Sequence, residues 1–225
     1  MIASYAQSLS HNIQKVIKKF GLQDAHPLST LLDPHHKLSQ SQSPSTAHQF
    51  DDMRNVPYRE AIGSLMYTAL GTHLDISFAV SFLAQFMQNP GRPHWEALKH
   101  VFHYLKGTKD LKLVIKGSQG GLEAFSDVDW ASQEHRHSIS GYVFTIDGSA
   151  VSWSSKKQPI VALSMTEAKY IAATHAMKEA LWICTFLGKI AHPLVKPITV
   201  HLDNISAISI TKNDEYHLRM KHIDI

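Results

Sequence analysis

The chain has 225 residues, of which 44% are hydrophobic and 18% charged, and its formal net charge is +3. This composition is typical of a globular protein with one large or two small cores, and the charge is too mild to require a polyanionic partner. The single cysteine, Cys184, excludes an intramolecular disulfide framework, and no apolar run approaches the ~18 residues that cross a bilayer. The N-terminus also lacks the pattern of a secretory signal, so we expect an intracellular protein with no membrane partner.

The first half of the chain is expected to be helical. Apolar residues at helical spacing predict a short amphipathic helix over residues 8–20. The stretch that follows is rich in Pro, Ser, Gln and His, which is typical of a flexible connector. From Pro57 apolar residues recur every three or four positions, and breaks at Gly71, residues 89–91 and Gly107 divide this pattern into three helices.

The second half has the alternation of an α/β fold. A tight-turn signal, Asp147-Gly148, separates two of the strands that the pattern predicts. A long helix with a small apolar stripe follows, and then one more strand and one more helix. The predicted elements are strands at 122–128, 141–146 and 150–154, a helix at 165–187, a strand at 198–202 and a helix from 204. We therefore expect a mixed sheet built from a three-strand antiparallel meander followed by helix, strand and helix.

Four acidic residues lie at the edges of these elements or near the chain end: Asp127, Glu167, Asp203 and Asp224. Carboxylates that converge repel one another unless a cation neutralises them, so convergence would create a divalent-metal site. An oxygen-only set without Cys or paired His fits Mg²⁺ or Mn²⁺ better than Zn²⁺. Two such ions ~3.5–4 Å apart can activate water and stabilise the leaving oxygen of a phosphodiester.

Each carboxylate also has a purely structural interpretation. Glu167 completes a capping box with Ser164, and Asp203 is placed to cap the helix after it. Asp127 and Asp129 alternate with Ser126, Val128 and Trp130, as acids on a solvated strand face do. Asp224 fits an ordinary surface carboxylate. The pair Lys156-Lys157 fits either phosphate contacts or a solvated strand end.

Several stretches together resemble the end of the polyprotein of copia-type long-terminal-repeat retrotransposons. They run in the family's order from Tyr58 to Ile225, about three quarters of the chain: VPYREAIGSLMYTALGTHLDISFAV, HWEALKHVFHYLKGT, FSDVDWA, SISGYVFTIDGSAVSWSSKKQPIVALSMTEAKYIAA, LDNISAI and KHIDI. The opening NIQKVIKKFGLQDAHPLSTLL looks like the same family's segment after the polymerase palm.

The resemblance implies a ribonuclease H-like fold preceded by the thumb and connection part of a reverse transcriptase. Its implied parts are a post-palm helix and connector at 1–56, a helical subdomain at 57–118 and a C-terminally truncated ribonuclease H-like domain at 119–225. It implies Mg²⁺ or Mn²⁺, as two ions, held by Asp127, Glu167, Asp203 and Asp224. His217 or His222 is a candidate for assisting proton transfer.

By the same resemblance, the substrate is an RNA–DNA hybrid, which proteins recognise by backbone shape and 2′-hydroxyls. The remaining reverse transcriptase polypeptide is a second expected partner. The implied location is a cytoplasmic virus-like particle or the nucleus.

The chain departs from the family in three ways. Where the family commonly has TEAEY, this chain has Thr166-Glu167-Ala168-Lys169-Tyr170. Lys169 is two residues beyond Glu167 and on a different helix face, so we expect it to have little effect on the metals. The family continues past Ile225 into a final helix. The Y-x-D-D polymerase motif is missing, which argues against DNA synthesis by this chain.

Three hypotheses remain open on the sequence. The leading one is a ribonuclease H-type, metal-dependent endonuclease, a fragment of a retrotransposon polyprotein that lacks the polymerase site. The alternative is a catalytically inactive, nucleic-acid-binding retrotransposon remnant. The third is a structural helical adaptor built on residues 57–107.

Overall fold

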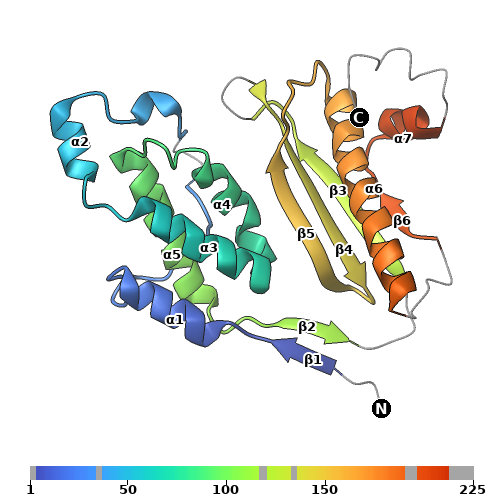
Figure 1. Cartoon of the computed structure of the whole chain (residues 1–225), viewed down its shortest axis with the longest axis horizontal. Coiled ribbons are helices and arrows are strands. Elements are labelled where there is room, and N and C mark those ends of the chain that lie inside the picture. Colours follow the sequence, from blue (N-terminus) through green and yellow to red (C-terminus); the bar gives the residue numbers. More distant parts are fainter. Residues whose placement is uncertain (1–3, 34–36, 117–120, 133–135, 191–196, 213–225) are drawn as a thin grey trace. The chain divides into compact units, whose positions relative to one another are not determined.

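The computed structural model describes residues 4–33, 37–116, 121–132, 136–190 and 197–212 (Figure 1). The chain divides into two compact units, Ala6–Leu113 and the remainder. None of the described helices is both long and apolar enough to span a membrane.

The first unit is a bundle of helices around one apolar core. Its main helices are α1 (Ser10–Lys19), α3 (Tyr58–Gly71), α4 (Ser77–Ala84) and α5 (Arg92–Thr108), and η2 (Leu74–Ile76) lies between α3 and α4. The helices predicted from apolar spacing are therefore confirmed. The largest fully buried side chains are apolar or aromatic, among them Tyr58, Leu65 and Phe102. The Tyr58 hydroxyl also donates a hydrogen bond to the Leu83 carbonyl at 2.9 Å.

The expected connector belongs to this bundle and contains two short helices, η1 (Gln40–Gln42) and α2 (Ala47–Met53). The buried ring of His94 accepts a hydrogen bond from the Gly91 amide at 2.8 Å, and its Nε2 lies 3.1 Å from the Ser39 carbonyl oxygen. Gly91 packs so closely that an added Cβ would lie 2.0 Å from the Gln42 carbonyl oxygen. These long-range contacts cannot be read from composition. They place the segment in the same unit as the helices, whereas the sequence predicted a boundary after residue 56.

The second unit contains a mixed four-stranded sheet. Its strands are β3 (Leu122–Asp129), β4 (Ile139–Ile146), β5 (Ser149–Lys157) and β6 (Thr199–His201), in the order β5-β4-β3-β6. The first three are antiparallel neighbours, and β6 runs parallel to β3. Asp147 and Gly148 both have positive φ, 53° and 72°, which confirms the predicted tight hairpin. The α/β prediction with a meander is confirmed.

One long helix, α6 (Met165–Lys189), packs against β3 and β4 and connects β5 to β6 (Figure 1). The predicted stripe of small and branched residues along it is buried, including Ala168, Ile171 and Ala172. β3 alternates as a half-buried strand does: Leu122, Ala124 and Ser126 are buried and the residues between them are exposed. A short helix, α7 (Ile205–Lys212), follows β6.

Two details differ from the sequence predictions. The strands β1 (Ser4–Gln7) and β2 (Leu113–Lys116) were not predicted and form a separate two-stranded sheet. In the sequence Cys184 falls among apolar residues at helical spacing, which predicts a buried structural thiol. Cys184 is exposed, so this prediction is wrong. Its neighbour Ile183 holds the buried position on α6, one residue or 100° around the helix.

Candidate functional site

The parallel pairing of β3 and β6 brings two of the predicted carboxylates together. In the register of this pair Phe125 is opposite His201, and their rings stack with centroids 4.7 Å apart. Asp127 lies two residues beyond Phe125, and Asp203 lies two residues beyond His201. Because parallel strands advance in step, residues about 76 positions apart in the sequence meet at one end of the sheet.

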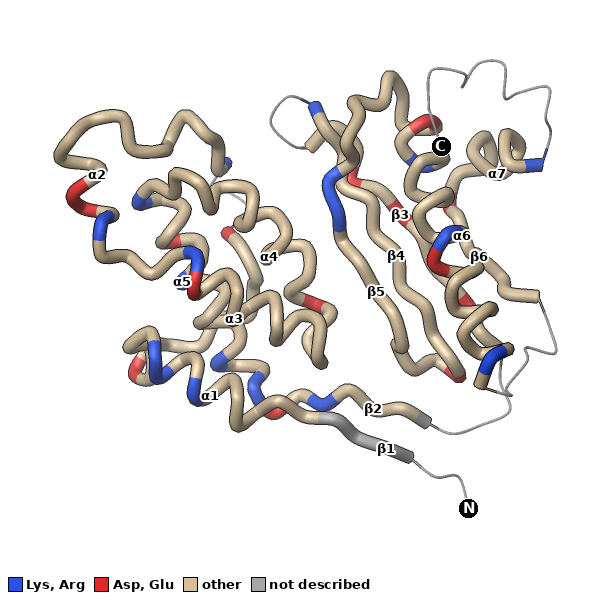
Figure 2. The backbone as a smooth tube through the Cα atoms, viewed as in Figure 1, with Lys and Arg blue, Asp and Glu red and all other residues tan. Residues whose placement is uncertain are grey.

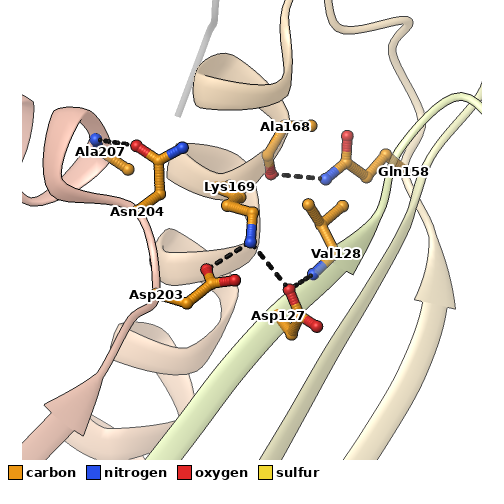
Figure 3. Close-up of polar contacts among 8 residues, drawn as sticks. All are labelled: Asp127, Val128, Gln158, Ala168, Lys169, Asp203, Asn204 and Ala207. Atoms are coloured by element: carbon orange, nitrogen blue, oxygen red, sulfur yellow. Dashed lines mark hydrogen bonds and ion pairs between the residues drawn. The ribbon is translucent and has the colours of Figure 1, made fainter.

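Both aspartates are bound by one lysine from α6. The Lys169 ammonium donates a hydrogen bond to Asp127 Oδ1 at 3.1 Å and another to Asp203 Oδ1 (Figure 3). The Lys169 side chain is only 11% exposed, whereas those of Asp127 and Asp203 are 75% and 64% exposed. A largely buried cation therefore lies between two carboxylates that are open to solvent on their other sides.

Glu167 has a different role in the described structure. Its carboxylate Oε2 accepts a hydrogen bond from the Leu163 amide at 2.8 Å, and its own amide is bound by the Ser164 hydroxyl. Glu167 is thus engaged at the start of α6, as the capping interpretation predicted. Residues 167 and 169 lie about 200° apart around a helix, so the helix presents Lys169, not Glu167, to the two aspartates.

The expectation that Lys169 has little effect on the site is wrong. Lys169 does lie on a different helix face from Glu167, but the face that meets Asp127 and Asp203 is the lysine's. The helix rotation is set by the buried stripe that contains Ala168, which packs toward the sheet. Glu167 and Lys169 flank this stripe on opposite sides.

The start of α6 is fixed to the sheet by Gln158, a residue that the sequence interpretation did not single out. Its buried side-chain amide donates hydrogen bonds of 2.9 Å to the Ser140 hydroxyl and to the Ala168 carbonyl oxygen. Ala168 immediately precedes Lys169, so the amide holds the backbone from which the lysine extends (Figure 3). A polar residue just after a predicted strand gave no signal of this role.

Asp203 does not serve as the cap of the following helix. The Asn204 side chain accepts the hydrogen bond from the Ala207 amide at 2.8 Å, which is the N-cap contact of α7. Asp203 is therefore left free of the capping role and its carboxylate turns toward Lys169 (Figure 3). Beside it lies an open groove of about 490 Å³ whose walls include Phe125, Tyr142 and His201.

The ion pairs shift both titrating groups toward their charged forms. The hydrogen bond from Lys169 lowers the pKa of the Asp203 carboxyl below its ordinary value. Burial alone would lower the pKa of the Lys169 ammonium, but its hydrogen bonds to Asp203 and Asp127 and their charges together raise it. The site is therefore two carboxylates and one ammonium at neutral pH, with a formal charge of −1.

The arrangement does not fit a divalent metal ion. Within the described ranges, no group of three or more His, Cys, Asp or Glu side chains is placed to hold one. Lys169 already satisfies one oxygen of each aspartate, and Mg²⁺ sites are built from oxygen ligands without a competing ammonium. Asp224, His217 and His222 lie outside the described residues.

The stability that the Asp203–Lys169 pair contributes should depend on pH. It is expected to be present above 3.8, the ordinary pKa of Asp203, and to disappear as the pH falls through the lowered value. At the alkaline end it is present below 10.5 and is lost as the pH rises through the raised pKa of Lys169.

We expect urea unfolding at neutral pH to show wild type more stable than Lys169→Met by up to about 1 kcal/mol, since the carboxylates are solvent-exposed. That difference should shrink in acid below pH 3.8. If the difference in unfolding free energy stays constant across the acid range, it arises from packing of the lysine stem and not from the ion pair.

Sequence comparisons identify the chain's relatives. The retrovirus-related Pol polyprotein from transposon TNT 1-94 of Nicotiana tabacum is 44% identical over 215 residues, which is 95% of this chain and 16% of that protein. The corresponding polyprotein from transposon RE1 of Arabidopsis thaliana is 37% identical over 203 residues, 89% of this chain and 13% of that protein. Over most of its length the chain is homologous to retrovirus-related Pol polyproteins from copia-type transposons.

This family match covers a small share of each relative, because the chain spans less than one fifth of the two polyproteins. A further relative, the secreted RxLR effector protein 161 of Plasmopara viticola, is 45% identical over 133 residues, 58% of this chain and 94% of that protein. No family model matches the chain, and no solved structure matches it either. The likeness to copia-type polyproteins that the motifs predicted is confirmed.

Proposed function

We propose that this copia-type segment is a ribonuclease H-like module, with a reverse transcriptase connection, that binds RNA–DNA hybrids without cutting them. One observation carries the proposal: the Lys169 ammonium lies between Asp127 and Asp203. Hydrolysis of a phosphodiester by paired metal ions requires a carboxylate cage, and here the helix residue that meets the strand carboxylates is a cation. The proposal thus selects the non-catalytic alternative that the sequence left open.

Binding is supported by the chemistry at the same end of the sheet. The end of β5 is basic, with Lys156 and Lys157 one and two residues beyond Ser155 (Figure 2). Ser155 is opposite Gly141, which in turn is opposite Asp127, so these lysines on β5 and the aspartate on β3 lie near the same end of the sheet, with β4 between their strands. Lysines attract the phosphate backbone independently of base sequence, which suits a hybrid recognised by its shape.

The test uses the whole chain and a labelled RNA–DNA hybrid, with Mg²⁺ or Mn²⁺ in excess. We expect retention of the hybrid in a gel-shift assay, weakening with salt, and no shortening of the RNA strand. Replacing Lys156 and Lys157 by glutamine should weaken retention and make the salt slope shallower by up to about one per lost phosphate contact. Lys18 and Lys19, an exposed pair on α1, provide a matched control.

Two results would contradict the proposal. One is a folded chain that does not retain the hybrid at low salt. The other is metal-dependent cleavage that disappears in Asp203→Asn. The second result would favour the other candidate function, the endonuclease. The convergence of Asp127 and Asp203 supports that candidate. That candidate requires Lys169 to leave the carboxylates.

A further inference from the structure

The side chain between the two aspartates has the features of a bound cation. This residue, Lys169, is 9% exposed, and its ammonium donates a hydrogen bond to one oxygen of Asp127 and one of Asp203. Asp127 lies on β3 and Asp203 lies two residues beyond the end of β6, and neither has another cationic partner among the described ion pairs. The Val128 amide also donates to Asp127 Oδ1 at 2.7 Å, but Lys169 is the described cation that offsets the repulsion between the two carboxylates.

The backbone around Lys169 makes this position rigid. The Ala168 carbonyl oxygen is bound by the buried Gln158 amide, and Ala168 itself is fully buried. One turn of helix cannot rotate to exchange residues 167 and 169 without exposing Ala168 and breaking this hydrogen bond. The residue type at position 169 therefore decides the charge of the site: −1 with lysine, −2 with a neutral residue and −3 with an acid.

We propose that Lys169 is a built-in counter-ion that stands in the place of a divalent cation, so that one substitution, Lys169→Glu, creates a three-carboxylate metal site with Asp127 and Asp203. The wild-type chain accordingly does not bind Mg²⁺ or Mn²⁺ through this aspartate pair. Glutamate at 169 supplies oxygen ligands from the same helix position and removes the competing ammonium, which are the two changes that a hard divalent ion needs. The inference deepens the proposed function, since it explains the absence of cutting by the chemistry of one side chain.

The experiment is a titration with Mn²⁺ alone, read by the electron paramagnetic resonance signal of the free ion, without any nucleic acid. We expect Lys169→Glu to bind Mn²⁺ at least about tenfold more tightly than wild type, a change of about 1.4 kcal/mol. Adding Asp203→Asn should remove this gain. Lys178→Glu, the same charge change at an exposed position of the same helix, should not gain affinity, which controls for net charge.

Two further measurements keep the inference testable if Lys169→Glu does not fold. Lys169→Gln should bind Mn²⁺ more tightly than wild type, because it removes the ammonium without adding a third charge. Asp203→Asn in the wild-type background should leave Mn²⁺ binding unchanged. A tenfold loss in that variant, or a folded Lys169→Glu that gains nothing over Lys178→Glu, would overturn the inference. The Mn²⁺ titration contains no hybrid, so its outcome is independent of the gel-shift assay. Either the metal inference or the proposed hybrid binding can therefore fail by itself.

Discussion

Replacing Phe144 by alanine is expected to destabilise the sheet-containing unit by about 3–5 kcal/mol. Phe144 is fully buried in a small core with Leu122, Ala124, Ala180 and Ile183, where it is the largest side chain. A core of this size has few neighbours that can collapse into the space left by the ring, so the cavity adds to the lost apolar burial. Hydrogen exchange should show lost protection in β3 and β4.

The matched control for this change is Phe125→Ala. Phe125 lies on β3 with 45% of its surface exposed, stacked on His201, so removing its ring should change stability by less than about 1 kcal/mol. The helical unit has its own core, and its protection should be retained in Phe144→Ala. Equal loss of protection in α3 and α5 would show that the two units unfold as one.

The second large effect is expected from Gln158→Met. Methionine keeps the length of the side chain but cannot donate, which leaves the Ser140 hydroxyl and the Ala168 carbonyl oxygen without their 2.9 Å hydrogen bonds. The Ala168 carbonyl lies inside α6 and keeps its helix hydrogen bond, so the loss is that of two side-chain hydrogen bonds, each worth about 0.5–1.5 kcal/mol. The loss should be concentrated in the first turns of α6, because that is where the amide holds the helix.

Hydrogen exchange and urea unfolding together check this prediction. Exchange at residues 165–171 should accelerate, and the unfolding free energy should fall, whereas Gln88→Met at an exposed turn position should change neither. The Gln158 Oε1 atom has no described partner, so its removal offsets part of the loss. Unchanged stability together with unchanged exchange at residues 165–171 in Gln158→Met would show that the amide does not anchor α6.

The two stability tests also bear on the candidate site, because Phe144 and Gln158 both lie in the unit that contains it. The site is assembled from the strand β3, the segment that follows β6 and the helix α6, all in the sheet-containing unit. Loosening the core under β4 or the anchor of α6 should therefore disturb the aspartate–lysine contacts without any change at the site itself.

Much of the fold could be predicted from the sequence because its causes are local. Apolar spacing located the helices, the Asp147-Gly148 turn located the hairpin, and the Ser164–Glu167 capping box located the start of α6. The packing of the connector could not be predicted, because it involves distant contacts such as that of His94 with the Ser39 carbonyl. Its two short helices begin with local capping boxes, Ser39–Gln42 and Thr46–Gln49, which composition does not reveal. Composition carries no information about a contact made 55 residues away.

The candidate site, like the fold, could be predicted from the sequence only in part. The sequence by itself determined that Asp127, Glu167 and Asp203 lie at element ends and that an acid of the family motif is replaced by Lys169. Only the tertiary structure decided which of residues 167 and 169 faces the aspartates. The reason is that each residue turns a helix by 100°, and the absolute rotation is set by how the Ala168 stripe packs on the sheet. Sequence spacing gives relative directions on a helix, whereas packing fixes them against a neighbouring strand.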